Sequence, residues 1–372
     1  MQLSIERAAL LKALAHVQSV VERRNTIPIL SNVLLLAEGD KLLFTATDMD
    51  LTILEEVSAG IAEEGATTVP AYTLYEIVRK LPEGAEVSLM AGGEGGQMTL
   101  RAGRSKFSLA TLPKEDFPSA GNEELPRSFT VSAGDLRNLV DRTRFAISTE
   151  ETRYYLNGIY LHAVEDEDRA VLRAVATDGH RLARFEMALP ESAKGMPGVI
   201  VPRKTVNELR KLIDGSEGEV KVSLSETKIC FAFDASLLTS KLIDGTFPDY
   251  QRVIPSGNDK TLDVNRREFA EAVDRVSTIS TEKSRAVKLA IDNGILTLSA
   301  NSPENGSAVE QIEVDYGGPA IEIGFNSRYL LDIAQQIEGE IAQLSMSDAA
   351  SPTVVREVAD DSALYVLMPM RV

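Results

Sequence analysis

One pattern occurs three times along this 372-residue chain, and it limits the possible folds more than any other feature. Each copy opens with three residues of alternating polarity and continues into a stretch with helical periodicity. The first apolar anchors of these stretches are 126 and 133 residues apart: Leu10, Leu136 and Phe269. A second helical stretch recurs at spacings of 132 and 123 residues, after Pro70, Pro202 and Phe325. Because self-similarity at a regular spacing indicates repeated structural units, the sequence predicts three domains of about 124 residues.

The repeats also predict the fold class. Each copy contains two helical stretches and many short runs of period two, such as residues 41–57. Strand-rich repeats with segregated helices are typical of α+β proteins. Polar, turn-rich segments near Gly121–Pro126 and Pro255–Lys260 separate the copies, so we expect domains at 1–122, 127–256 and 260–372. The expected helices cover residues 8–24, 71–81, 133–145, 203–213, 266–279 and 327–337.

Charge is distributed unevenly between these helices and the rest of the chain. The net charge is −17, which taken alone argues against nucleic-acid binding. The six predicted helices, however, carry 16 Lys and Arg against 9 Asp and Glu, whereas the remaining residues carry 23 against 47. A basic helical surface would attract phosphates without reading base sequence. The alternative is that Lys and Arg are simply favoured in helices, where they form i,i+4 ion pairs.

Composition excludes several classes of protein. A single cysteine, Cys230, rules out an internal disulfide and suits a reducing compartment, and we expect it to be a small core residue. The three histidines lie far apart in the sequence, so neither a metal site nor a cofactor is expected. No apolar run reaches the ~18 residues of a membrane span, and the N-terminus lacks the pattern of a signal peptide. We therefore expect a cytoplasmic protein that does not contact a membrane.

One segment could carry catalytic chemistry. Asp178-Gly-His180-Arg181 combines a carboxylate with an imidazole, which would suit a hydrolase. The same segment reads as a hairpin turn between apolar runs, and Ala46-Thr47-Asp48 stands at the matching place in the first copy. A repeated hairpin corner favours the structural interpretation.

At this point several segments, taken together, give the chain a specific resemblance over its whole length to the bacterial DNA polymerase III β subunit, the family of DNA sliding clamps. These segments are TIPILSNVLL (26–35), RSKFSLATLPKEDFP (104–118), RYYLNG (153–158), ATDGHRL (176–182), VIVPRK (199–204), TSKLIDGTFPDYQRVIP (239–255), IEIGFN (321–326) and YVLMPMR (365–371).

The resemblance implies a non-catalytic processivity factor. It implies three clamp domains per chain, each with two helices against antiparallel sheets, that close as a head-to-tail homodimer into a ring of six domains. Helices would line the hole around double-stranded DNA, and sheets would form the rim. The implied partners are the clamp loader, the DNA polymerase III catalytic subunit, and other polymerases and repair proteins that carry a short clamp-binding motif.

The resemblance also implies three sets of functional residues. The partner-peptide pocket would comprise Leu156, Thr177, Gly179, His180, Arg181, Leu182, Pro248, Arg252, Val253, Val366, Met368, Pro369, Met370 and Arg371. The DNA-binding set would comprise Arg24, Arg79, Lys80, Arg137, Arg142, Tyr154, Tyr155, Arg203, Lys204, Arg210 and Lys211. The dimer interface would comprise Arg104, Lys106, Phe107, Leu109, Thr278, Ile279 and Glu304.

Two rival hypotheses remain at this level. In the first, His180 and Asp178 form the centre of a hydrolase. In the second, the chain is a clamp-like paralogue that keeps the fold but has lost its work on DNA. A steep fall of DNA affinity with salt would speak against the paralogue.

Overall fold

The α+β class is confirmed by the computed structural model, which describes residues 1–21, 26–92, 96–119, 124–166, 169–280 and 285–371. Within these residues the chain forms six α-helices and 25 β-strands, and the strands make four sheets. The helices are α1 (Arg7–Val17), α2 (Ala71–Lys80), α3 (Ala133–Asp141), α4 (Arg203–Leu212), α5 (Arg266–Ser277) and α6 (Ser327–Ala334). Among the short 3-10 turns, two matter below: η4 (Glu151–Leu156) and η6 (Tyr250–Val253).

The chain divides into two compact units that do not coincide with the predicted repeats. The first unit comprises Met1–Arg137, Pro190–Ala193 and Lys204–Leu242, and the second comprises Asn138–Leu189, Lys194–Arg203 and Ile243–Val372. The middle copy is therefore shared between the two units. The reason is strand pairing, because each half of the middle copy continues a sheet of a neighbouring copy.

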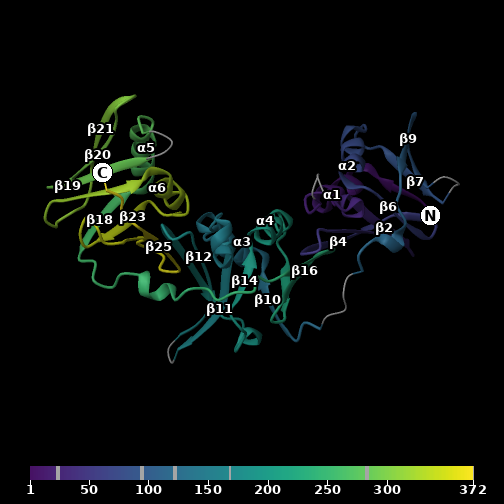
Figure 1. Ribbon diagram of the computed structural model, residues 1–372, viewed down its shortest axis with the longest axis horizontal. Helices are drawn as coiled ribbons and strands as arrows, with labels where there is room; N and C mark the ends of the chain where they lie inside the picture. Colours follow the sequence, from purple (N-terminus) through teal and green to yellow (C-terminus); the bar gives the residue numbers. More distant parts are fainter. Residues whose placement is uncertain (22–25, 93–95, 120–123, 167–168, 281–284, 372) are drawn as a thin grey trace. The chain divides into compact units, whose positions relative to one another are not determined.

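In the first unit, one sheet has the order β5-β1-β7-β8-β9 and the other has the order β10-β15-β16-β17-β4-β3-β2-β6. Strand β17 of the middle copy pairs antiparallel with β4 of the first copy. Figure 1 shows these strands in purple to teal, with α1 beside α2. The strands are β1 (Gln2–Glu6), β2 (Asn32–Glu38), β3 (Lys41–Thr47), β4 (Leu51–Ser58), β5 (Gly60–Glu63), β6 (Gly65–Pro70), β7 (Glu86–Ala91), β8 (Gln97–Ala102), β9 (Ser105–Ala110), β10 (Arg127–Ser132), β15 (Glu219–Leu224), β16 (Lys228–Phe233) and β17 (Ser236–Lys241).

The second unit repeats this construction. One sheet has the order β14-β11-β12-β13-β25-β24-β23-β18 and the other has the order β21-β20-β19-β22. Strand β25 of the third copy pairs antiparallel with β13 of the middle copy. The strands are β11 (Gly158–Asp166), β12 (Arg169–Thr177), β13 (Arg181–Ala188), β14 (Val199–Pro202), β18 (Lys260–Asn265), β19 (Ala286–Asp292), β20 (Ile295–Ser302), β21 (Gly306–Glu313), β22 (Ile321–Asn326), β23 (Ile341–Met346), β24 (Thr353–Glu357) and β25 (Ala363–Leu367).

Hydrophobic periodicity explains why these segments form these elements. In β3, alternate side chains point to opposite faces, and Leu42, Phe44 and Ala46 are fully buried. In α2, the buried residues Leu74 and Val78 are four apart and so share one face. The helices pack these apolar faces on the sheets and in pairs, α1 with α2 and α5 with α6.

Several predicted helices extend too far at their C-terminal ends. The largest differences are in α1, α3 and α6, which end at Val17, Asp141 and Ala334. The first helix ends at Val17 and not at residue 24, because Gln18 closes the last turn and Ser19 donates a hydrogen bond of 2.8 Å to the carbonyl of His16. Side-chain bonds of this kind compete with continued helix formation. Helix α3 ends at Asp141, and residues 144–146 form a separate 3-10 turn.

The structure also describes the surroundings of Cys230 and the length and polarity of the helices. Cys230 is buried in β16, as expected of a small core residue. None of the helices in the described part of the chain is long and apolar enough to cross a membrane.

Candidate partner surface, DNA-facing helices and sheet edges

The segment Thr177–Leu182 forms a tight turn between β12 and β13. The Asp178 carboxylate accepts hydrogen bonds from the backbone N–H groups of His180 (2.9 Å) and Arg181 (3.0 Å), and the Thr177 hydroxyl donates to the carbonyl of Arg181 (2.7 Å). Gly179 has a φ of 87°, which glycine adopts without strain. The carboxylate of Asp178 is thus used to build the turn, which is the structural interpretation of this motif.

Arg181 fastens this turn to its surroundings. Its guanidinium pairs with Asp178 (3.2 Å) and Asp332 (2.5 Å) and donates to the carbonyl of Phe145 (2.7 Å). It also lies 4.3 Å from the ring centre of Tyr329. Arg181 is buried and each of its three guanidinium nitrogens donates a hydrogen bond, so it fixes the position of the turn. A planar guanidinium with five donors suits such a multiple role.

An apolar cluster lies beside the turn. Three predicted pocket residues belong to it, namely Leu156, Leu182 and Val366. They pack with Val175, Ile200, Phe247 and Tyr250. The cluster joins strands β12, β13, β14 and β25 to η4 and to the segment that precedes the third copy, so residues far apart in the sequence build one surface.

Exposed apolar side chains lie next to this cluster. Val253 is 47% exposed and Met368 is 40% exposed, although both are large and apolar. Pro248, Arg252 and Arg371 are also exposed, and Pro369 and Met370 are half-buried. Exposed apolar side chains beside a well-packed cluster are typical of a binding surface for a short apolar motif.

Backbone hydrogen bonds hold the C-terminal tail beside the turn. The N–H of Met368 donates to the carbonyl of His180 (2.9 Å), which extends the pairing of β25 with β13 by one residue. The N–H of Met370 donates to the carbonyl of Gly324 (2.8 Å). The tail therefore brings Met368 next to His180 of the turn. We call the turn 177–182, the segment 247–254 and the tail 366–371 the partner surface.

A buried polar network anchors the segment 247–254. Arg173 donates to the Tyr250 hydroxyl (2.8 Å) and to the Glu186 carboxylate (2.6 Å). The Tyr250 hydroxyl lies 3.0 Å from Nε2 of His162, and because it already accepts from Arg173, we assign it as the donor to the neutral imidazole. Burial lowers the pKa of His162, which favours this neutral form.

The helices are basic overall, but less so than the sequence suggested. Within the observed helix bounds, the six helices carry 13 Lys and Arg against 8 Asp and Glu. Helices α1, α2 and α4 carry 8 against 2, whereas α5 and α6 carry 4 against 4. The positive charge is therefore concentrated on three helices of the first unit and its border.

Many predicted DNA contacts already have acidic neighbours in the chain. Lys80 and Lys211 are largely exposed, and each forms an ion pair with a glutamate on its own helix. Arg79 pairs with Glu76 on the same helix, and Arg210 pairs with Asp214, two residues after the end of α4. The pairs of Arg79 and Lys80 with Glu76 are partly exposed and contribute little to stability, so these bases can turn to a phosphate at small cost. Lys211 differs, because its partner Glu208 is buried and would lose a countercharge.

Other members of the predicted DNA set have structural roles. Arg142 is 8% exposed and pairs with Glu338 (2.9 Å). Arg137 donates to the carbonyls of Ile213 (3.0 Å) and Ser216 (2.8 Å), just after the end of α4. We leave both out of the DNA surface proposed below, because a guanidinium held in this way would have to leave its partners to reach a phosphate.

The remaining predicted DNA residues have varied surroundings. Tyr154 is exposed on η4, and its ring lies 5.7 Å from that of Tyr155. Arg203 is exposed at the start of α4, and the ammonium of Lys204 contacts the Asp48 carboxylate. Arg24 lies outside the described residues.

The predicted dimer residues lie at two sheet edges. Lys106, Phe107 and Leu109 are on β9, the last strand of its sheet, with Arg104 in the turn before it. Thr278 and Ile279 follow α5, which packs against β21, the edge strand of another sheet. Glu304 lies in the turn before β21. An edge strand presents unpaired backbone donors and acceptors, which makes it a template for pairing with another chain.

Models of one family match almost the entire chain. The N-terminal, central and C-terminal domains of the DNA polymerase III beta subunit match residues 1–121, 130–249 and 251–371. The beta sliding clamp of Caulobacter vibrioides is 57% identical over 372 residues, covering 100% of both chains. That of Escherichia coli K12 is 40% identical over 372 residues, again covering 100% of both. The chain belongs to the DNA polymerase III β subunit family.

Solved structures agree with this assignment. A sliding clamp from Bartonella birtlesii bound to griselimycin has a TM-score of 0.97 and 52% identity, and the match covers 100% of each chain. The Caulobacter crescentus β clamp with polyethylene glycol bound has a TM-score of 0.97 and 57% identity, covering 100% of this chain and 99% of that one. The chain thus has three tandem clamp domains, and its function is that of a sliding clamp, a replication processivity factor that is not itself catalytic.

Sequence reasoning missed some residues of these surfaces. Val309 on edge strand β21 is 67% exposed, and the sequence GSAVEQIE gave no warning because it does not show which face of the strand is covered. The network of Arg173, Glu186 and Tyr250 was also missed. An arginine and a glutamate at apolar strand positions are the signal that could have indicated it, because buried charges need partners.

The lowered pKa of His162 implies that the free energy of unfolding depends on pH. Below about pH 6.5 the unfolded chain binds a proton at this residue that the folded chain resists, so the free energy of unfolding falls as the pH falls from 7.5 to 5.5. We expect His162→Gln to flatten this dependence, measured as the urea midpoint at each pH. His180→Gln is the matched control for loss of an imidazole outside the network. A slope in His162→Gln as steep as that of the unsubstituted chain would contradict the prediction.

Proposed function

We propose that this chain closes head to tail with a second copy into a six-domain ring around double-stranded DNA, and that it tethers its partners through the partner surface. The clamp loader, the DNA polymerase III catalytic subunit, and other polymerases and repair proteins with a short clamp-binding motif would be these partners. The proposed domains are residues 1–122, 127–256 and 260–372, and the proposed location is the cytoplasm, which suits a chain with one buried thiol.

One observation carries the peptide-binding part of the proposal. The turn, the segment 247–254 and the tail are brought together by backbone hydrogen bonds and by a common apolar cluster, and they leave Val253 and Met368 exposed beside it. Methionine and aliphatic side chains accept Leu and Phe side chains of a partner without demanding one geometry. Tethering by such a surface raises the effective concentration of a polymerase at the primer end.

The DNA-binding part is supported by the charge on α1, α2 and α4. Diffuse attraction to phosphates has no sequence register, so a ring held by it can slide. The residues proposed to provide this attraction are Arg24, Arg79, Lys80, Arg203, Lys204, Arg210 and Lys211. Tyr154 and Tyr155 are proposed as neutral contacts to the DNA backbone or bases. Retention would come from encirclement and not from affinity. This fits a surface on which the exposed bases Arg79 and Lys80 already form ion pairs with Glu76.

The dimer part is supported by the exposed edges of two sheets. Strands β9 and β21 each end a sheet, and pairing β9 of one copy with β21 of the other would cover both edges. Phe107 and Leu109 would then face Thr278 and Ile279 of the second copy. A head-to-tail contact of this kind gives a closed ring when the rotation completes a circle.

The peptide-binding proposal predicts the effect of two alanine substitutions and of one deletion at the C-terminus. Met368→Ala and Val253→Ala should each weaken binding of a fluorescent Gln-Leu-Ser-Leu-Phe peptide by about tenfold in anisotropy titrations, or about 1.4 kcal/mol. A chain lacking residues 368–372 should not bind it. Val358→Ala is the matched control, because Val358 is similarly exposed in the second unit but lies outside the partner surface. Full affinity in all variants would refute the assignment.

The DNA-binding proposal predicts a change in salt dependence. The double variant Lys80→Gln, Lys211→Gln should bind a labelled DNA duplex more weakly, and the slope of log affinity against log salt should become shallower by up to about 2. Lys221→Gln is the matched control, because Lys221 is an exposed lysine on β15 of the same unit, outside the helices. Equal slopes for the double variant and the control would remove α2 and α4 from the DNA surface.

The dimer proposal predicts the effect of a charge at the β9 edge. Phe107→Asp should shift the chain from a particle of twice 40.4 kDa to one of 40.4 kDa in sedimentation velocity runs at micromolar concentration. The shift is expected because a carboxylate would be buried in the seam without a partner. Met90→Asp, on β7 of the same sheet and separated from β9 by β8, should leave the dimer intact. An unchanged mass for Phe107→Asp would place the interface elsewhere.

A further inference from the structure

The first unit contains a second copy of the turn that forms the partner surface. Between β3 and β4, the Thr47 hydroxyl donates to the carbonyl of Leu51 (3.0 Å), and the Asp48 carboxylate accepts from the N–H groups of Asp50 (3.0 Å) and Leu51 (2.7 Å). Met49 has a φ of 80°, at the position where the other turn has Gly179 with a φ of 87°. The two turns therefore share one hydrogen-bond pattern.

The strand beside the turn is also repeated. The N–H of Lys241 donates to the carbonyl of Asp50 (2.8 Å), just as the N–H of Met368 donates to the carbonyl of His180 (2.9 Å). Strand β17 pairs with β4 in the register in which β25 pairs with β13. Phe117-Pro118, at the end of the first copy, corresponds to Phe247-Pro248. All three parts of the partner surface thus have counterparts here.

A cavity of about 620 Å³ lies at these counterparts, and all of its lining residues belong to the first unit. Its apolar lining includes Leu34, Leu54, Phe117 and Leu237. The cavity volume lies within the range of small-ligand sites and matches a few amino-acid residues. Met49 lines the cavity and is 53% exposed, so its side chain is accessible to a molecule bound there.

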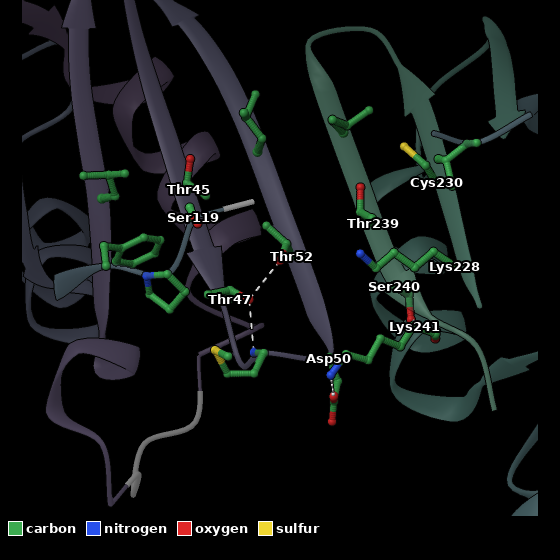
Figure 2. Close-up of a pocket in the computed structure, with 17 residues that line it drawn as sticks. Thr45, Thr47, Asp50, Thr52, Ser119, Lys228, Cys230, Thr239, Ser240 and Lys241 are labelled. Atoms are coloured by element: carbon green, nitrogen blue, oxygen red, sulfur yellow. Dashed lines mark hydrogen bonds and ion pairs between the residues drawn. The ribbon is translucent and has the colours of Figure 1, made fainter. Parts of the chain in front are cut away.

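The cavity differs from the partner surface in chemistry. The pairing registers place Thr52 opposite Thr239, where the other junction has Leu182 opposite Val366. Thr45 is equivalent to Val175, because each lies two residues before the threonine of its turn. Thr45 pairs with Leu34 of β2, and Val175 pairs with Tyr160 of β11. Three aliphatic side chains of the apolar cluster are thus replaced by three threonines that line the cavity (Figure 2). The hydroxyls can hydrogen-bond to peptide groups, which the aliphatic side chains cannot.

The charge of the lining also differs. Lys241 stands where the other junction has Met368, and Lys228 lines the same cavity. Asp50 is the single acidic residue of the lining, and it pairs with Lys241 at 2.9 Å (Figure 2). The lining is therefore positive by one charge, in a chain whose net charge is −17. The carboxylate of a bound molecule can replace Asp50 as the ion-pair partner of the Lys241 ammonium, because this pair is exposed.

We propose that this cavity is a second peptide site, which binds a short acidic segment of a partner protein. An aliphatic side chain of the segment would lie among Leu34, Leu54 and Leu237. Its carboxylate would pair with Lys241, and its backbone amides would hydrogen-bond to the threonines. The inference rests on the proposed function of the partner surface, because it extends that role to the equivalent junction of the repeat. The two sites would have different specificity, apolar at the tail and acidic in this cavity. A partner with both kinds of segment would be held at two points of one chain, which multiplies its affinity.

One titration tests the two sites separately in the full chain. Methyl groups of methionine are labelled with ¹³C, and Met49 reports on the cavity while Met368 reports on the partner surface. The assignments come from Met49→Leu and Met368→Leu. The probes are acetyl-Glu-Leu-Asp-Leu-amide, its neutral counterpart acetyl-Gln-Leu-Asn-Leu-amide, and Gln-Leu-Ser-Leu-Phe. We expect the acidic peptide to shift Met49 saturably and at least fivefold more tightly than the neutral one.

Variants then test the assigned contacts. Lys241→Met introduces the residue type of the other junction and should lower the affinity for the acidic peptide, read from the Met49 signal, by at least fivefold. Thr239→Val should lower this affinity by a smaller factor. Lys221→Met, on the neighbouring part of the same sheet, is the control. A Met49 signal that no peptide moves at millimolar concentration, while Gln-Leu-Ser-Leu-Phe moves Met368, overturns the second site and leaves the proposed function standing. Equal affinity for the acidic and neutral peptides overturns the acidic occupant. A Met368 signal that stays still refutes the partner surface instead.

Discussion

Antiparallel pairing between neighbouring copies of the repeat is the interaction on which the rest of this structure depends. Strand β17 joins β4, and β25 joins β13, so that each junction is a continuous sheet and not a flexible linker. The pairing ends at a Thr-Asp turn whose carboxylate holds the backbone. Because the last hydrogen bond of each pairing falls on Asp50 or His180, the turn and the chain segment after the paired strand are forced to lie together.

That constraint explains how a binding surface arises without catalytic chemistry. The hydrolase hypothesis paired the Asp178 carboxylate with His180, but that carboxylate accepts the backbone N–H groups of the turn and pairs with Arg181. The surface around these residues includes the exposed apolar side chains Val253 and Met368 beside a packed cluster. The hydrolase hypothesis therefore lost its physical basis in the geometry of the turn, and the family assignment agrees with this.

Electrostatics in this chain works through segregation and not through net charge. Helices α1, α2 and α4 are strongly basic, whereas α5 and α6 are balanced. Arg79, Lys80 and Lys211 are already paired with a glutamate on the same helix, which would moderate the attraction for phosphate that we propose for them. Moderate and diffuse attraction is what a sliding protein needs, since tight contacts would stop its movement.

The repeat also offers one construction with two different linings. At one junction Leu182 and Val366 face each other, and at the other Thr52 and Thr239 do, with the backbone hydrogen bonds unchanged. Leu and Val fill space and exclude water, whereas Thr keeps a similar shape and adds a donor and an acceptor. Specificity can thus diverge while the fold is retained, because pairing depends on the backbone and recognition depends on the side chains.

The sequence by itself determined the number of copies, the α+β class and the presence of a structural turn at Asp178. These follow from periodicity and from local hydrogen bonding, which act over a few residues. It did not determine that the compact units would cut across the copies, that α1 would end at Val17, or that Arg137 and Arg142 would be tied to other parts of the chain. Those outcomes depend on strand pairing and on partners far away in the sequence, so only the tertiary structure could decide them.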